Sequence, residues 1–196
     1  AKVRMAMLQA LWAQRSQLPE QQRDELEPIL QFAPQYAGLM ANALMVAYEQ
    51  LQQFDAGLEL LLKNYDQHPN LDVFNEVFKA LRTQRGSIEA WHFARKALRR
   101  LPSLLALDRM LEVELSLQQS EENPAEAKDL VQDSLIKEIA AGADLSLLRS
   151  LIHKHTQRLE RYACEECGFE TRHYYWQCPG CNCWESYPPL RLEELQ

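Results

Sequence analysis

Apolar side chains recur every three to four residues along most of the first 160 positions, with polar residues between them. This spacing predicts amphipathic helices, because a strand would alternate every second residue. Capping and breaking residues help to set the boundaries, such as Gly86 followed by Ser87 as an N-cap, and Asn123 followed by Pro124. The expected helices form consecutive pairs: residues 2–16 with 20–32, 36–52 with 55–67, 71–85 with 88–100, and 103–118 with 124–140.

A ninth helix is expected to begin near Asp144, just after Gly142. Its apolar stripe would consist of Leu148, Leu151, Ile152, His155 and Leu159, while His153 would lie on its surface. The composition supports the helical interpretation, because the chain contains 32 leucines and 21 alanines, whereas valine, isoleucine and threonine together number 14. The fold class is therefore predicted to be mostly α.

Prolines recur at a regular interval within the helical region. Pro34, Pro69 and Pro102 are 35 and 33 residues apart. The residues twelve and twenty-one positions before the last two prolines repeat as well, first small and then large: Gly57 and Tyr48, then Ala90 and Leu81. This pattern resembles tetratricopeptide repeats, in which a small residue lets two antiparallel helices approach closely and a proline ends the second helix. We therefore expect residues 1–160 to form a helical-hairpin solenoid, with a non-repetitive helical bundle as the alternative.

Solenoids of this kind bind other proteins along a curved inner face, which the first helix of each pair lines. The repeat offsets place six candidate partner-binding residues on that face: Asn42, Val46, Glu49, Asn75, Lys79 and Arg82. Asp108 and Glu112 would follow one repeat later. For each of these positions, a merely solvated helix residue is the alternative interpretation.

All five cysteines lie between Cys164 and Cys183. Two C-x-x-C pairs, Cys164 with Cys167 and Cys178 with Cys181, are separated by ten residues. Each pair can direct two thiolates at one ion, so together they predict a single tetrahedral site for zinc or iron. A closed tetrathiolate leaves no position for water, which favours a structural metal over a catalytic one. Cys183 is interpreted as a bystander, with a redox-sensitive thiol as the alternative.

Residues 161–196 are predicted to form a separate metal-binding ribbon and tail. The ribbon is too small to bury a sufficient core, so metal binding should supply on the order of 10 kcal/mol of folding free energy. Residues 169–176 are predicted to form an aromatic strand, with Tyr174 and Trp176 on one face and Tyr175 on the other. Because so small a ribbon cannot bury both faces, we expect one aromatic face to dock on the neighbouring helical body.

The charge of the chain disfavours nucleic acid as a partner. The formal net charge is -7, and the ribbon carries two arginines against four glutamates, so phosphate would be repelled. No apolar run approaches the roughly 18 residues that a membrane span requires. There is no secretory signal, and clustered thiolates favour a reducing compartment.

The helical array followed by C-E-E-C-G-F, a Tyr-Tyr-Trp segment and C-P-G-C resembles the lipopolysaccharide assembly protein B family. The resemblance covers essentially the whole chain, as the C-terminal part of that family, and its most specific element is the rubredoxin-like ribbon. It implies that the metal ligands are Cys164, Cys167, Cys178 and Cys181. Asn182 stands where rubredoxins have a glycine, which is tolerable because asparagine visits the left-handed region. The spacer between the cysteine pairs is shorter than in rubredoxins, which counts against electron transfer.

The resemblance further implies a non-enzymatic adaptor at the cytoplasmic face of the bacterial inner membrane, held there by an N-terminal helix that this fragment lacks. Its implied partners are the deacetylase of lipid A synthesis and a membrane-bound ATP-dependent protease, which it would link to regulate lipopolysaccharide synthesis. Three alternatives stay open: a general protein-interaction scaffold, an iron-thiolate redox module, and the helical arm of a glycosyltransferase. The last is disfavoured because no sugar-nucleotide domain or convergent acid/base set is present.

Overall fold

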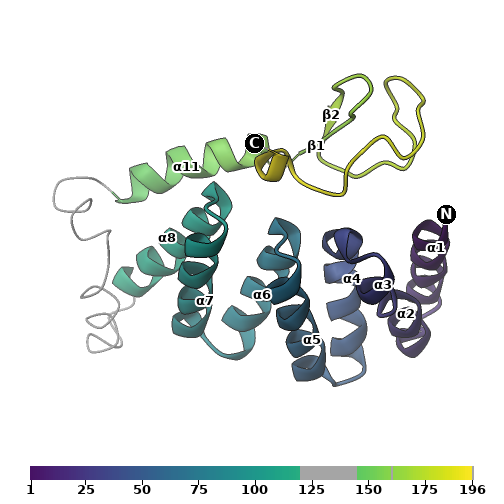
Figure 1. The fold of residues 1–196 in the computed structure, drawn as a ribbon. Helices are drawn as coiled ribbons and strands as arrows, with labels where there is room; N and C mark the ends of the chain where they lie inside the picture. Colours follow the sequence, from purple (N-terminus) through teal and green to yellow (C-terminus); the bar gives the residue numbers. More distant parts are fainter. Residues whose placement is uncertain (120–144, 160, 196) are drawn as a thin grey trace. The chain divides into compact units, whose positions relative to one another are not determined.

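The computed structural model describes residues 1–119, 145–159 and 161–195 (Figure 1). The fold is mostly α, as predicted, with a small two-stranded sheet near the C-terminus. The chain divides into two compact units, one made of Ala1–Leu81 with Glu160–Gln196 and the other of Arg82–Leu159. The ribbon thus shares a unit with helices that are remote from it in sequence. Among the described residues, no helix has the length and apolar character needed to cross a membrane.

The first unit begins with a series of short helices. They are α1 (Lys2–Arg15), α2 (Pro19–Leu26), α3 (Ile29–Phe32), the 3₁₀ helix η1 (Pro34–Tyr36), α4 (Ala37–Gln50), α5 (Phe54–Gln67) and α6 (Leu71–Gln84), whose last turn extends past Leu81. Helix α1 contacts α2, α2 contacts α4, and α4 contacts α5. Helical pairs therefore build this part of the unit, as the apolar pattern predicts.

The segment 20–32 was predicted as one helix, and this is wrong. Helix α2 ends at Leu26, and a separate short helix begins at Ile29. Pro28 lies between them, where it lacks an N–H for the helical ladder and its ring crowds the preceding turn. The apolar periodicity continues across Pro28, which is why the pattern alone did not reveal the break.

Helices α4 and α5 meet at the small-and-large pair that the repeat predicts. A Cβ atom added to Gly57 would lie 2.7 Å from Cγ of Tyr48, so only glycine lets the two backbones come this close. The Tyr48 ring is held in place because its hydroxyl donates to Glu27 Oε2 at 3.1 Å. The small position therefore has the steric role that the repeat pattern assigns to it.

Helix α6 has a broad buried face. Its buried residues are Leu71, Val73, Phe74, Val77, Phe78, Ala80 and Leu81. Phe74 contacts Tyr65 of α5, with ring centroids 6.3 Å apart. Helix α5 ends at Gln67, two residues before Pro69, as the repeat predicts for a proline after the second helix of a pair.

The second unit contains α7 (Ser87–Arg100), α8 (Leu104–Gln119) and α11 (Leu145–Leu159), and α8 contacts both of the others. Ser87 was predicted as an N-cap but is instead the first residue of α7, with Gly86 in the capping position and no side-chain cap bond. Gly86 has a φ of 97°, which glycine adopts without strain, so the chain turns directly into the helix. The predicted helix 124–140 and its cap at Asn123 and Pro124 lie outside the described residues, as do Gly142 and Asp144.

The predicted apolar stripe of α11 is only partly correct. Leu148, Ile152 and Leu159 are half-buried, but Leu151 is 53% exposed and His155 is also exposed. The most buried side chain of the helix is Thr156, whose hydroxyl donates to the Ile152 carbonyl at 3.0 Å. The prediction failed because α11 pairs with α8 through polar groups as well as apolar ones.

The ribbon contains the strands β1 (Tyr162–Ala163) and β2 (Glu170–Thr171), which pair antiparallel, and it is followed by the 3₁₀ helix η2 (Leu192–Leu195). The predicted strand 169–176 is therefore wrong beyond Thr171. The facing pattern nevertheless holds, because Tyr174 and Trp176 contact each other while Tyr175 is exposed. Beyond Thr171, the backbone is next paired at Trp176, whose carbonyl accepts from Glu185 N at 2.7 Å, beside an isolated antiparallel bridge between Gln177 and Trp184.

We predict that Gly57→Ala destabilises the chain. Alanine favours a helix by up to about 1 kcal/mol over glycine, but the added methyl group would overlap the Tyr48 ring, at a cost of about 1–3 kcal/mol. Urea unfolding followed by circular dichroism should therefore show a lower free energy of unfolding for Gly57→Ala than for the unchanged chain. In a Tyr48→Ala background the same substitution should be neutral or stabilising. An equal loss in both backgrounds would contradict the steric account.

Candidate metal centre

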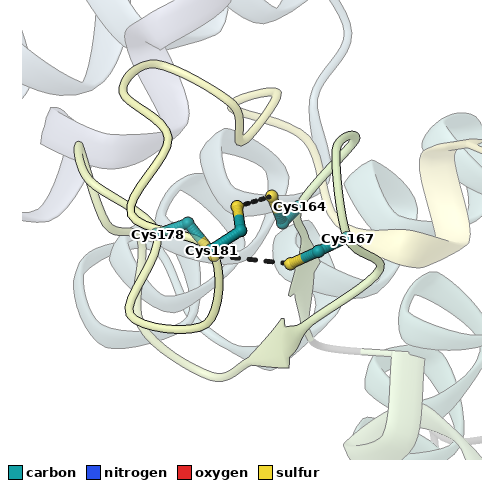
Figure 2. A group of neighbouring side chains, drawn as sticks. All are labelled: Cys164, Cys167, Cys178 and Cys181. Carbon is teal, nitrogen blue, oxygen red and sulfur yellow. Dashed lines mark hydrogen bonds between the residues drawn. The ribbon is translucent and has the colours of Figure 1, made fainter.

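Four cysteine side chains converge within the ribbon (Figure 2). The Sγ atoms of Cys164, Cys167, Cys178 and Cys181 all lie within 4.8 Å of one another. The separation is 3.8 Å between Cys164 and Cys181, and 3.7 Å between Cys167 and Cys178. A tetrahedral ion with metal–sulfur bonds of about 2.3 Å would place its sulfurs about 3.8 Å apart. The four residues therefore form a tetrathiolate site suited to one zinc or iron ion, as predicted.

The two C-x-x-C turns share one backbone conformation. The Cys164 carbonyl accepts a bond from Gly168 N, and the Cys178 carbonyl accepts one from Asn182 N, both at 2.8 Å. Gly168 and Asn182 have φ angles of 71° and 61°, in the left-handed region that glycine and asparagine enter most readily. The expectation that Asn182 can replace a glycine here is confirmed.

Cys183 has the same place in the second turn that Phe169 has in the first. The Phe169 carbonyl accepts from Cys164 N at 3.1 Å, and the Cys183 carbonyl accepts from Cys178 N at 2.8 Å. The backbone N–H groups of Phe169 and Cys183 also bond to the second thiol of their own turn. The Cys183 side chain also approaches the Cys181 thiol and raises its pKa, so the interpretation of Cys183 as a bystander stays a prediction.

Polar side chains approach the thiols from the segment after the second turn. Ser186 Oγ lies 3.2 Å from Cys164 Sγ, and the Tyr187 hydroxyl lies 3.6 Å from Cys178 Sγ. Burial raises the pKa of the Cys178 thiol, but the N–H of Cys181 and the Tyr187 hydroxyl outweigh it and lower that pKa to about 6. The Cys178 thiol thus favours the thiolate, which is the form that binds metal. At Cys181, a backbone N–H lowers the pKa, but burial and the neighbouring thiols outweigh it and raise that pKa.

Aromatic side chains attach the ribbon to the helices of the first unit. Trp176 stacks on Tyr36 of η1, with ring centroids 5.6 Å apart, and Tyr174 meets Trp176 edge-on at 5.1 Å. Leu39 of α4 packs against the buried cluster around Tyr162. The predicted docking on the helical repeats is therefore confirmed, and within this unit the partners include η1, α4 and α6. Helix α1 takes part as well, because its Arg4 lies over the Trp184 ring, 4.9 Å from the centroid.

A polar contact reinforces this docking at Asp72, in the first turn of α6. The Tyr162 hydroxyl donates to Asp72 Oδ2 at 2.9 Å. The Arg191 guanidinium donates through Nε at 2.9 Å and lies 2.8 Å from Oδ1 through its terminal nitrogen. It also covers the Tyr162 ring, 4.2 Å from the centroid. Burial and the Asp72 charge raise the pKa of Tyr162, so its hydroxyl stays a donor.

The predicted partner-binding residues fall in both units. Five of them, hereafter the inner face, lie on α4 and α6 of the first unit: Asn42, Val46, Glu49, Asn75 and Lys79. Asn42 and Lys79 both bond to Glu76, at 3.0 and 2.7 Å, which joins α4 to α6. Arg82 belongs to the second unit, where it pairs with Glu112.

Asp108 and Glu112 were predicted to follow on the same face one repeat later, and for Asp108 this is wrong, whereas Glu112 is partly exposed. Asp108 is only 1% exposed, with Arg149 Nε 3.4 Å and His153 Nδ1 3.1 Å from its carboxylate. Burial raises the pKa of Glu112, but Arg109 and Arg82 outweigh it and lower that pKa. Helix α11 supplies Arg149 and His153, so it covers this part of α8. His153 is therefore partly exposed but also bonded.

The sequence did not reveal the residues that seat the ribbon. Asp72 was seen only as part of a helical pattern, and Arg191 and Glu194 lie in a tail without a motif. Ser186 beside Cys164 was also missed. Each acts through a contact between segments distant in the chain, for which a single sequence carries no signal.

Comparison with known proteins agrees with the site and the fold. A family described as "Rubredoxin metal binding domain" matches residues 162–189. Lipopolysaccharide assembly protein B of Haemophilus influenzae strain Rd is 28% identical over 170 residues, covering 86% of this chain and 38% of that protein. The protein of the same name from Escherichia coli strain K12 is 24% identical over 148 residues, covering 76% and 33%.

Over most of its length, the chain is therefore similar to lipopolysaccharide assembly protein B. The resemblance expected from its cysteines and helical array is thereby confirmed. The chain spans about a third of the length of these curated relatives, 38% of the first and 33% of the second.

Replacing Cys178 with serine should abolish metal binding, because three thiolates leave the tetrahedral shell open. Cys183→Ser should retain about one ion per chain, since the backbone of Cys183 is unchanged. Metal content per chain, measured by mass spectrometry on untagged protein, would separate the two variants. Full metal retention in Cys178→Ser would contradict the assignment.

Proposed function

We propose that this chain is part of a non-enzymatic adaptor that regulates lipopolysaccharide biosynthesis by binding other proteins. The name of its homologues supports a role in lipopolysaccharide assembly. In its finer form, the proposal follows the family resemblance: the partners are the lipid A deacetylase and a membrane-bound ATP-dependent protease. The longer protein would then act at the cytoplasmic face of the inner membrane, through an N-terminal anchor.

The observation that carries this proposal is that the docked ribbon adjoins the inner face. On α4, Leu39 packs against the ribbon, and Asn42, Val46 and Glu49 follow at helical intervals. On α6, Asp72 holds the ribbon, and Asn75 and Lys79 follow in the same way. A partner lying along the inner face would therefore also touch the ribbon.

The chemistry of the metal centre supports a scaffold. Four thiolates complete the coordination of a zinc ion, so no position is left for a substrate or an activated water. Such an ion stabilises a small fold and sets the position of its surface groups. An adaptor needs surface groups in fixed positions at the edge of its binding surface, and a structural metal ion provides them.

The second candidate function, an iron-thiolate redox module, is favoured by one feature of the site. Cys167 is exposed, so one ligand of the ion faces solvent, as electron exchange would require. A visible absorption spectrum of untagged protein, purified without added metal, would distinguish iron from zinc. A colourless protein with one zinc per chain would exclude this candidate.

The adaptor proposal predicts that exchanging two charges on the inner face weakens partner binding. Glu49→Lys with Lys79→Glu leaves the net charge unchanged but reverses the local pattern. Affinity for the purified deacetylase and protease should fall at least about fivefold, corresponding to about 1 kcal/mol at an interface. Arg82 is left intact because its pairing with Glu112 stabilises the second unit.

The matched control is the same exchange on the exposed side of α5, Glu59→Lys with Lys63→Glu. It should leave both affinities unchanged. If the inner-face exchange also had no effect while removal of residues 162–196 abolished binding, the partner surface would have to be moved to the ribbon.

A further inference from the structure

We infer that Arg191 and Glu194 form a latch through which the metal state of the ribbon controls the inner face. This inference rests on the proposed function, because it assigns a regulation to the same binding surface. The latch consists of the contacts that these two residues make with the first turn of α6.

The first turn of α6 depends on Glu194 for one of its amides. The first N–H groups of a helix lack partners within it. Asn70 satisfies two of them, because its side chain accepts from Asp72 N at 2.9 Å and Val73 N at 3.1 Å. Its carbonyl accepts from Phe74 N, which is the first ordinary bond of the helix. The remaining donor, Leu71 N, bonds to Glu194 Oε1 at 2.9 Å.

Glu194 therefore caps the N-terminus of α6, although it lies 123 residues after Leu71 in the sequence. Its carboxylate lies where the helix dipole is positive, which favours a negative group. Its other oxygen, Oε2, accepts from Arg191 N at 2.9 Å. The cap and the Arg191–Asp72 contact thus belong to one short segment and should form and break together.

This segment is bound to the ribbon next to the metal ligands. Leu192 N donates to the Arg161 carbonyl at 2.8 Å, and Arg191 lies over Tyr162, two residues before Cys164. A ribbon of this size lacks the core to hold its shape without metal. Loss of the ion should therefore release Tyr162 and the tail, leaving Leu71 N and Asp72 without these partners.

Loss of these contacts would also affect the inner face, because α6 carries part of it. A Cβ atom on Gly38 would lie 2.5 Å from Asn70 Oδ1, so the start of α6 is fitted closely against α4. One turn later, Glu76 bonds to Asn42 and Lys79. Fraying of the first turn would loosen this arrangement, so the inner face should be ordered only when the metal is bound.

Amide hydrogen exchange of Leu71 in the full chain tests the latch directly. In the zinc-loaded protein this amide should be protected, and chelation should speed its exchange at least about tenfold. Glu194→Ala should have the same effect with zinc still bound. The matched control, Glu166→Ala, alters an exposed carboxylate of the same ribbon and should not. Unchanged exchange in both the chelated protein and Glu194→Ala would overturn the inference.

Partner binding then separates a failure of the latch from a failure of the proposed function. With zinc bound, Glu194→Ala should lower affinity for the same purified partners at least about threefold. If the inner-face exchange lowers affinity and Glu194→Ala does not, the latch does not regulate the face and this inference is wrong. If neither variant changes affinity although Leu71 exchange responds as expected, the proposed binding surface itself is wrong.

Discussion

The carboxylate of Asp72 is the point on which the organisation of the first unit depends. It receives the Tyr162 hydroxyl and the Arg191 guanidinium, both from the ribbon and its tail, while it stands in the first turn of α6. The side chains of Asp72 and Arg191 are 18% and 20% exposed, so the pair is largely shielded from water. Removing one partner of a shielded, bidentate pair costs more than removing one partner of a surface ion pair, because the other charge is left without compensation.

Metal binding and docking have complementary roles in this arrangement. The tetrathiolate gives the ribbon a fixed shape, because its buried cluster of Tyr162, Cys164, Cys178 and Tyr187 is too small to do so alone. Docking then uses the aromatic residues that this small core cannot cover, among them Trp176 against Tyr36. The ion thus stabilises the ribbon, and the aromatic side chains that the ribbon cannot bury itself become buried when it docks on the helices.

The sequence predicted those features that local chemistry determines. Paired C-x-x-C turns define a metal site wherever they fold together, and the Gly57 and Tyr48 offsets describe one helical contact. Contacts between distant segments were not predictable in the same way. The break at Pro28 lay within a continuous apolar pattern, and the burial of Asp108 depends on polar groups of α11. Arg191 and Glu194 carry no motif, although they decide how the ribbon is seated.

A double-mutant cycle on Asp72 and Arg191, measured with and without metal, tests the central claim most directly. The free energy of unfolding would be determined for the full chain, Asp72→Ala, Arg191→Ala and the double variant. With zinc bound, the coupling energy should be about 1–3 kcal/mol, and after chelation it should fall close to zero. An equal coupling energy in the two states would show that the ribbon seats on α6 independently of its metal, which would contradict the account.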